Sequence, residues 1–239
     1  MSDSPEVDDK VLLITGAGSG IGAATARRMA GEYRLVLAGR RIEPLQELAA
    51  ELGGDARALA VTCDVGECDE VEAMTAAALD EFGRIDAVFA NAGFGATRGF
   101  LEETPEQWKS MILTNVLGPA LTIRATLPHL LERGDGHFLI TSSIAGRRVL
   151  PGSMYSVTKF AATTIGEALR QELRGMDDEN RIKVTLIEPG MVDTPFFDNR
   201  PGDWALKDED IANAVAYAMD QPDAVDVGEI LIRPITQGT

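Results

Sequence analysis

The chain has 239 residues, of which 45% are hydrophobic and 25% are charged, so it is long enough to bury the core of one large α/β domain. Its formal net charge of −16 disfavours nucleic acid and anionic membranes as partners, because both bind basic surfaces. No apolar run approaches the roughly 20 residues that span a bilayer, and residues 1–10 lack the features of a secretory signal. We therefore expect a cytoplasmic protein with no membrane partner.

Apolar runs alternate with helical segments along the whole chain. The runs predict strands at residues 11–15, 35–38, 58–63, 87–90, 138–141, 184–187 and 228–233, and helices are predicted at 21–30, 44–52, 105–131 and 154–173. Strands that are apolar on successive residues are buried on both faces, and alternation with helices indicates a parallel sheet. The sequence thus predicts the α/β class: a Rossmann-type doubly wound parallel sheet of about seven strands, layered α/β/α, in a single domain over residues 1–239.

A glycine-rich turn, Thr15-Gly-Ala-Gly-Ser-Gly-Ile-Gly22, joins the first strand to the first helix. Glycines let the backbone approach a pyrophosphate, and the N-terminus of the following helix offers free N–H groups and a positive dipole. The spacing Gly16-x₃-Gly20-x-Gly22 differs from the commoner G-x-G-x-x-G, but the place directly after the first buried strand favours a nucleotide site.

The second strand is followed by Arg40 and Arg41, where an acidic residue would bind a ribose 2′-hydroxyl. Guanidinium groups suit a 2′-phosphate, so we expect NADP(H) in preference to NAD(H), although both arginines could be solvated surface residues. Asp64, after the third strand, is a candidate acceptor for the adenine amino group. Asn91-Ala92-Gly93, after the fourth, would let the backbone pass close to the cofactor ribose.

Tyr155 and Lys159 lie four residues apart in a predicted helix, so their side chains share one face. An ammonium group near a phenol stabilises the phenolate, and we expect it to lower the pKa of the phenol from its usual value near 10. A serine pair, Ser142-Ser143, ends the fifth strand and could polarise a carbonyl. Asn115 is a polar residue in an otherwise apolar helix and needs a partner.

Taken together, these pieces resemble the short-chain dehydrogenase/reductase family, in its main single-domain NADP-dependent branch. The matching pieces occur in family order over nearly the whole chain: Thr15–Gly22, Asp64, Asn91-Ala92-Gly93, Asn115, Ser143-x-x-Gly146, Tyr155-x-x-x-Lys159 and Pro189-Gly-Met-Val-Asp-Thr194.

The resemblance implies an enzyme that reduces a carbonyl to, or oxidises, a secondary alcohol by hydride transfer, without a metal. It implies that Tyr155 is the general acid or base, that Lys159 lowers its pKa and holds the nicotinamide ribose, and that Ser143 orients the substrate oxygen. Asn115 would hold a water in a proton relay. The cofactor-binding set that follows is Gly16, Ser19, Gly20, Ile21, Gly22, Arg40, Arg41, Asp64, Val65, Asn91, Ala92, Gly93, Tyr155, Lys159, Pro189, Gly190, Val192 and Thr194.

Several alternatives stay open. Family members place the serine thirteen positions before the tyrosine, which fits Ser142, whereas the glycine three places later fits Ser143. A non-catalytic NADP(H)-binding sensor on the same fold is the alternative function. Residues 194–207 are expected to form a substrate lid, and the chain is expected to be a homotetramer or dimer. An apolar pocket for a small or medium substrate, or else core and lid packing, would use Phe94, Met154, Met191, Phe196, Phe197 and Trp204.

Overall fold

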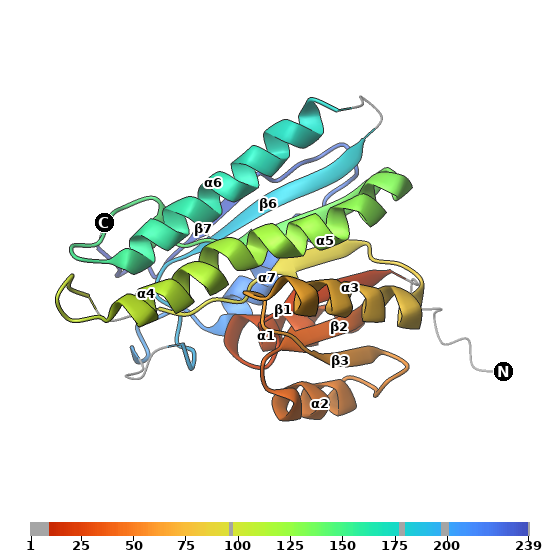
Figure 1. Ribbon diagram of the computed structural model, residues 1–239, viewed down its shortest axis with the longest axis horizontal. Helices are drawn as coiled ribbons and strands as arrows, with labels where there is room; N and C mark the ends of the chain where they lie inside the picture. The colour runs from red at the N-terminus through yellow and green to blue at the C-terminus, as the bar shows by residue number, and fades with distance from the viewer. Residues whose placement is uncertain (1–9, 96–97, 177–179, 197–200, 239) are drawn as a thin grey trace.

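The computed structural model describes residues 10–95, 98–176, 180–196 and 201–238. Seven parallel strands form one sheet in the order β3-β2-β1-β4-β5-β6-β7, which confirms the predicted fold class (Figure 1). The strands are β1 (Val11–Thr15), β2 (Arg34–Gly39), β3 (Ala58–Thr62), β4 (Ala87–Ala90), β5 (Asp135–Thr141), β6 (Arg181–Pro189) and β7 (Glu229–Ile232).

Helices cover both faces of the sheet. They are α1 (Gly20–Met29), α2 (Ile42–Glu51), α3 (Cys68–Phe82), α4 (Pro105–Ile112), α5 (Gly118–Arg133), α6 (Met154–Arg174) and α7 (Asp208–Met219). In Figure 1, α4, α5 and α6 run across the front of the molecule. Among these described residues, no helix combines the length and the apolar character that a membrane crossing needs.

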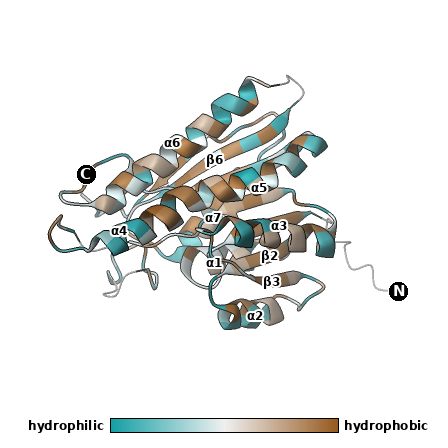
Figure 2. Cartoon of the chain, viewed as in Figure 1, coloured by the Kyte–Doolittle hydropathy of each residue, from teal (hydrophilic) through white to brown (hydrophobic). Residues whose placement is uncertain are grey.

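The core divides into two clusters because successive strand residues point to opposite faces of the sheet. On β1, Leu12 and Ile14 pack with α1, α2 and α7, whereas Val11 and Leu13 pack with α3, α5 and α6. Figure 2 shows mostly hydrophobic strands, whereas hydrophobic and hydrophilic residues alternate along the helices. Burial on both sides explains why the strands are apolar on consecutive positions.

The strand order reverses between β1 and β4, which are neighbours in the sheet. In such sheets the crevice outside the carboxyl ends of the strands, at the point of reversal, is the usual place for a ligand. The glycine turn after β1 and the Asn91 segment after β4 both lie at that point.

The helix predicted at residues 105–131 is interrupted. A π-helical turn, η1 (Leu113–Leu117), separates α4 from α5, and the N–H of Gly118 bonds to the carbonyl of Leu113. Pro119 has no N–H and so removes the bond that an α-helix would make to the carbonyl of Asn115. Pro119 thus lies just after the wider turn, in the first turn of α5.

Candidate active site

The glycine turn brings the backbone of β1 close to the start of α1. Gly16 has φ of 68°, a left-handed conformation that favours glycine. A Cβ at Gly22 would lie 2.3 Å from the carbonyl oxygen of Gly16, so the two backbone segments touch. Within the described chain, Ser19 precedes α1 without a side-chain capping bond. The first N–H groups of α1 therefore keep the capacity to bind an anion.

Asn91 connects three neighbouring strands below this turn. Its side-chain amide donates to the carbonyl of Thr15 at 3.2 Å, and its side-chain oxygen accepts from the hydroxyl of Thr141 at 3.0 Å. The Thr15 hydroxyl in turn accepts from the N–H groups of Asn91 and Ala92. These bonds fix the carboxyl ends of β1, β4 and β5 relative to one another.

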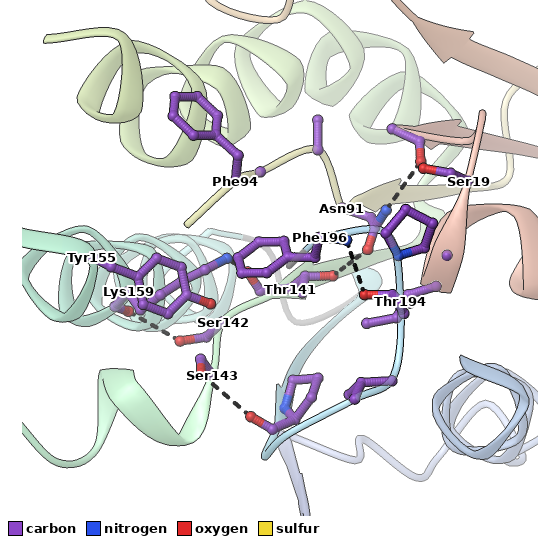
Figure 3. Close-up of a pocket in the computed structure, with 18 of the residues that line it drawn as sticks. Ser19, Asn91, Phe94, Thr141, Ser142, Ser143, Tyr155, Lys159, Thr194 and Phe196 are labelled. Atoms are coloured by element: carbon purple, nitrogen blue, oxygen red, sulfur yellow. Dashed lines mark hydrogen bonds between the residues drawn. The ribbon is translucent and has the colours of Figure 1, made fainter. Parts of the chain in front are cut away.

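A cavity of about 300 Å³ opens at this edge of the sheet (Figure 3). It brings together most of the predicted site residues, from the glycine turn at one end to Tyr155 and Ser143 at the other. Its lining residues are Gly16, Ser19, Gly20, Ile21, Asn91, Ala92, Gly93, Phe94, Thr141, Ser142, Ser143, Tyr155, Lys159, Pro189, Gly190, Val192, Thr194, Pro195 and Phe196.

A second cavity, of about 130 Å³, extends toward β2 and β3 and shares Gly16, Ala92, Gly93 and Phe94 with the first. Its lining includes three of the predicted adenine-end residues, Arg40, Asp64 and Val65. The Asp64 carboxylate accepts a bond from the N–H of Gly66 at 2.9 Å. Among the predicted residues that the structure describes, Gly22, Arg41 and Asn115 line neither cavity.

Lys159 lies one helical turn beyond Tyr155 on α6, as the spacing predicts. Its ammonium group donates to the carbonyl of Thr141 at 2.8 Å and lies 5.7 Å from the centre of the Tyr155 ring. The pKa of Tyr155 differs from our expectation: desolvation raises it to about 12, and a hydrogen bond with Ser143 opposes the rise. Desolvation also lowers the pKa of Lys159 to about 8, so burial disfavours the charged form of both groups.

The two serines point to different partners. The Ser142 hydroxyl is buried, donates to the carbonyl of Lys159 at 3.0 Å and lies 2.7 Å from the hydroxyl of Thr163. The Ser143 hydroxyl lines the same cavity as Tyr155, donates to the carbonyl of Pro189 at 3.3 Å and accepts from the N–H of Ala145. In Figure 3 both lie at the end of β5, facing α6 and the loop after β6 respectively.

Asn115 sits in the π-helical turn and is 2% exposed. Its amide donates to the carbonyl of Phe94 at 2.9 Å and to the hydroxyl of Thr158 at 3.1 Å, while its oxygen accepts from the N–H of Phe94. A Cβ on Gly93 would lie 3.1 Å from the Asn115 oxygen and 3.6 Å from the Lys159 nitrogen. Gly93 therefore lies in contact with both side chains, and a larger residue at this position would crowd them.

The predicted apolar pocket is only partly formed by the expected side chains. Phe94 and Phe196 line the cavity, and the Phe196 ring meets the Tyr155 ring edge-on at 5.7 Å. Met154, Met191 and Trp204 are not among its described lining residues, and Trp204 is exposed. Phe197 lies outside the described residues, as do positions 198–200 of the predicted lid 194–207.

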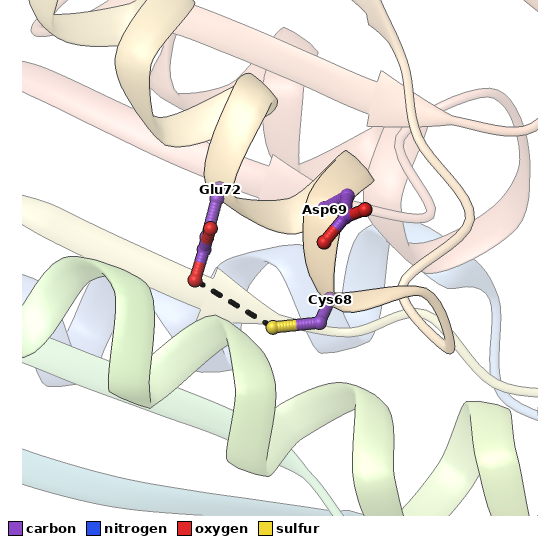
Figure 4. Close-up of side chains that lie close together, drawn as sticks. All are labelled: Cys68, Asp69 and Glu72. Atoms are coloured by element: carbon purple, nitrogen blue, oxygen red, sulfur yellow. Dashed lines mark hydrogen bonds between the residues drawn. The ribbon is translucent and has the colours of Figure 1, made fainter.

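Thiol and carboxylate groups come together away from this site, at the start of α3 (Figure 4). Ligand atoms of Cys68, Asp69 and Glu72 lie within 4.8 Å of one another, and the Cys68 thiol bonds to a Glu72 oxygen at 3.6 Å. Desolvation and the Glu72 charge raise the pKa of this thiol, which disfavours the thiolate that a metal would need. The thiol of Cys63 is buried.

The fold and the cavity at the carboxyl ends of its strands define a class of α/β proteins that the comparisons with known proteins identify. The model of the family described as short chain dehydrogenase matches residues 10–204. The chain belongs to this family and is an oxidoreductase of that kind, as the resemblance indicated.

Named relatives extend the likeness over nearly the whole chain. An uncharacterized oxidoreductase of Staphylococcus aureus is 40% identical over 231 residues, which cover 95% of this chain and 98% of the relative. The alcohol dehydrogenase of the archaeon Thermococcus sibiricus, solved with 5-hydroxy-NADP, is 33% identical with a TM-score of 0.87, covering 96% and 98%. The 3-ketoacyl-(acyl-carrier-protein) reductase of Brucella melitensis, solved with NADH, is 30% identical with a TM-score of 0.86, covering 95% and 98%.

Sequence reasoning did not assign roles to three threonines that hold the site together. Thr15 and Thr141 anchor Asn91, the Thr141 carbonyl holds Lys159, and Thr158 binds Asn115. Thr15 and Thr141 are each the last residue of a strand that leads to the site, and this position in the sequence could have indicated their roles. Thr158 gave no signal of its own, because its partner lies 43 positions away.

Proposed function

We propose that this protein is an NADP(H)-dependent oxidoreductase that interconverts a carbonyl and a secondary alcohol of a small or medium apolar substrate. The observation that carries the proposal is a single cavity whose lining includes the glycine turn together with Ser143, Tyr155 and Lys159. The names of similar proteins, an alcohol dehydrogenase and a ketoacyl reductase, support chemistry of this type.

The residues present fit a dinucleotide. The two cavities share a wall and together extend from Arg40 to Tyr155. The start of α1 would hold the pyrophosphate, and Asp64 and Val65 would border the adenine. Arg40, which lines the far cavity, would bind the 2′-phosphate, which favours NADP(H) although one similar structure carries NADH. Pro189, Gly190, Val192 and Thr194 would border the nicotinamide.

When bound, the cofactor supplies or accepts the hydride. Tyr155 gives its proton to the substrate oxygen in reduction and removes it in oxidation, and Ser143 holds the same oxygen by a second hydrogen bond. Lys159, fixed by the Thr141 carbonyl, stabilises the phenolate that reduction leaves and holds the nicotinamide ribose. Asn115 would hold a water in a proton relay from Lys159 toward solvent. Phe94 and Phe196 exclude water from the substrate side.

The test is a panel of neutral ketones, aldehydes and secondary alcohols, with NADPH absorbance as the readout and the Tyr155→Phe variant as the matched control. We expect turnover with at least one ketone and its loss by about 10²-fold or more in the variant, because the ring keeps its packing and loses its proton. Unchanged binding of NADPH to the variant shows that the site is intact. A variant that keeps more than about a tenth of the wild-type rate refutes the role of Tyr155.

A further inference from the structure

A buried carboxylate stands behind the wall of the cavity, where three segments of the chain meet. Glu188 lies near the end of β6 and is 1% exposed. It directly precedes Pro189, whose carbonyl accepts the bond from the Ser143 hydroxyl. Desolvation raises the pKa of Glu188, which shows that its carboxylate needs a compensating partner.

Arg147 supplies that partner. Its Nε lies 2.7 and 2.9 Å from the two oxygens of Glu188, and its Nη2 lies 2.5 Å from an oxygen of Glu229, which is exposed. Arg147 directly follows the 3₁₀ turn Ile144–Gly146, and Ser143 is the N-cap of that turn. A buried carboxylate is strongly disfavoured without its cation, so the pair fixes this turn against β6.

Glu188 is also tied to α6. The Thr163 hydroxyl donates to a Glu188 oxygen at 3.3 Å and lies 2.7 Å from the Ser142 hydroxyl, which bonds to the carbonyl of Lys159. Gly146 packs on the same carbonyl, because a Cβ there would lie 2.7 Å from it. The turn, α6 and β6 are therefore held together one helical turn from Tyr155.

We infer that Glu188 and Arg147 are positioning residues that set the Ser143 hydroxyl against the Tyr155 phenol. Among the described residues, the cavity lining includes neither of them, so they act through Ser143 and do not touch the substrate or the cofactor. The inference rests on the proposed function, since the placement of Ser143 matters only if Ser143 and Tyr155 act on the substrate.

The first experiment compares Glu188→Gln with Glu229→Gln. Both remove one carboxylate partner of Arg147 and keep the size of the side chain, but only Glu188 is buried. We expect kcat of Glu188→Gln to fall about tenfold, because small misplacements of reacting groups have large effects on rate. The KM for NADPH should stay within about twofold, and Glu229→Gln should resemble wild type. Wild-type kcat in Glu188→Gln overturns the inference.

The second experiment separates positioning from a merely structural role. If Glu188 acts through Ser143, Glu188→Gln lowers kcat far less in a Ser143→Ala background than in wild type. Equal fold losses in the two backgrounds overturn the inference. If Glu188→Gln does not fold, Arg147→Lys takes its place, because it keeps the charge and loses the planar guanidinium. The same two measurements apply to it: the fall in kcat, and the size of that fall in the Ser143→Ala background.

The same assay separates failure of the proposed function from failure of this inference. Turnover that Tyr155→Phe does not reduce would overturn the proposed function and this inference together. Turnover that depends on Tyr155, with independent effects of Glu188 and Ser143, would overturn this inference alone.

Discussion

Among single residues, Tyr155 determines the pH dependence that we expect. Desolvation raises its pKa to about 12, so the phenol keeps its proton at neutral pH. Carbonyl reduction uses this protonated form, whereas alcohol oxidation uses the phenolate, whose population grows with pH. We therefore expect kcat/KM for oxidation to rise between about pH 7 and about pH 9.5 and that for reduction to stay nearly flat. An oxidation profile already level at neutral pH would contradict this expectation.

The neighbouring serines offer a comparison within one turn of chain. Ser143 is the serine whose proximity opposes the rise in the pKa of Tyr155, whereas Ser142 bonds to α6 through the Lys159 carbonyl and Thr163. We expect Ser143→Ala to reduce turnover at saturating NADPH far more than Ser142→Ala. The latter should instead lower the free energy of unfolding by about 1–2 kcal/mol, the usual effect of losing a buried hydrogen bond. If Ser142→Ala is the more damaging change for turnover, the assignment is reversed.

We expect Arg40 to determine the preference for NADPH over NADH. Removing a charge-assisted contact to a phosphate weakens binding by about 1.5–3 kcal/mol. Arg40→Ala should therefore raise the KM for NADPH and leave that for NADH nearly unchanged. Arg41→Ala is the matched control, since both arginines are exposed but only Arg40 is in a described cavity lining. Equal losses with both cofactors would show that Arg40 does not read the 2′-phosphate.

At the scale of elements, the contact between the glycine turn and α1 has a measurable consequence. A Cβ at Gly22 would meet backbone atoms of Gly16, whereas a Cβ at Gly31, just after α1, would meet nothing within 4 Å. We expect Gly22→Ala to lower the free energy of unfolding by about 1–3 kcal/mol and to weaken cofactor binding. Gly31→Ala should be neutral or stabilise by up to about 1 kcal/mol. Urea denaturation measures both, and a stable Gly22→Ala variant would show that the turn can relax.

The strands show where apolar patterning locates elements and where it misses their ends. Each predicted strand is present, but β5 and β6 begin earlier than the apolar runs, at Asp135 and Arg181. These polar residues are paired with each other at the start of the two strands, so they carry no apolar signal although they belong to the ladder. The π-helical turn at Asn115 was not predicted, because it lies inside a run that the sequence indicates to be a single helix.

For the whole molecule, we predict a homo-oligomer, a tetramer or a dimer. On α6, Val157 and Phe160 are 54% and 39% exposed, and Ile112 and Leu117 near the π-helical turn are 41% and 38% exposed. Apolar side chains of this size at the surface favour association with a second copy. Light scattering at micromolar concentration should give a multiple of the chain mass, and Val157→Glu should reduce it. A monomer mass for the wild type would refute the prediction.

The sequence by itself determined the parallel sheet, the strand after which each motif falls, and the family. These follow from local patterns, because burial on both faces of a strand and a glycine-bounded turn leave their signal within a few consecutive residues.

Only the tertiary structure decided how the site works in detail. It turned Ser143 toward Tyr155 and Ser142 toward α6, joined Arg147 to Glu188 across 41 positions of chain, and raised the Tyr155 pKa where a nearby Lys159 predicted a lower one. Such features depend on which distant segments meet and on how much water they exclude, and the spacing of residues along the chain predicts neither.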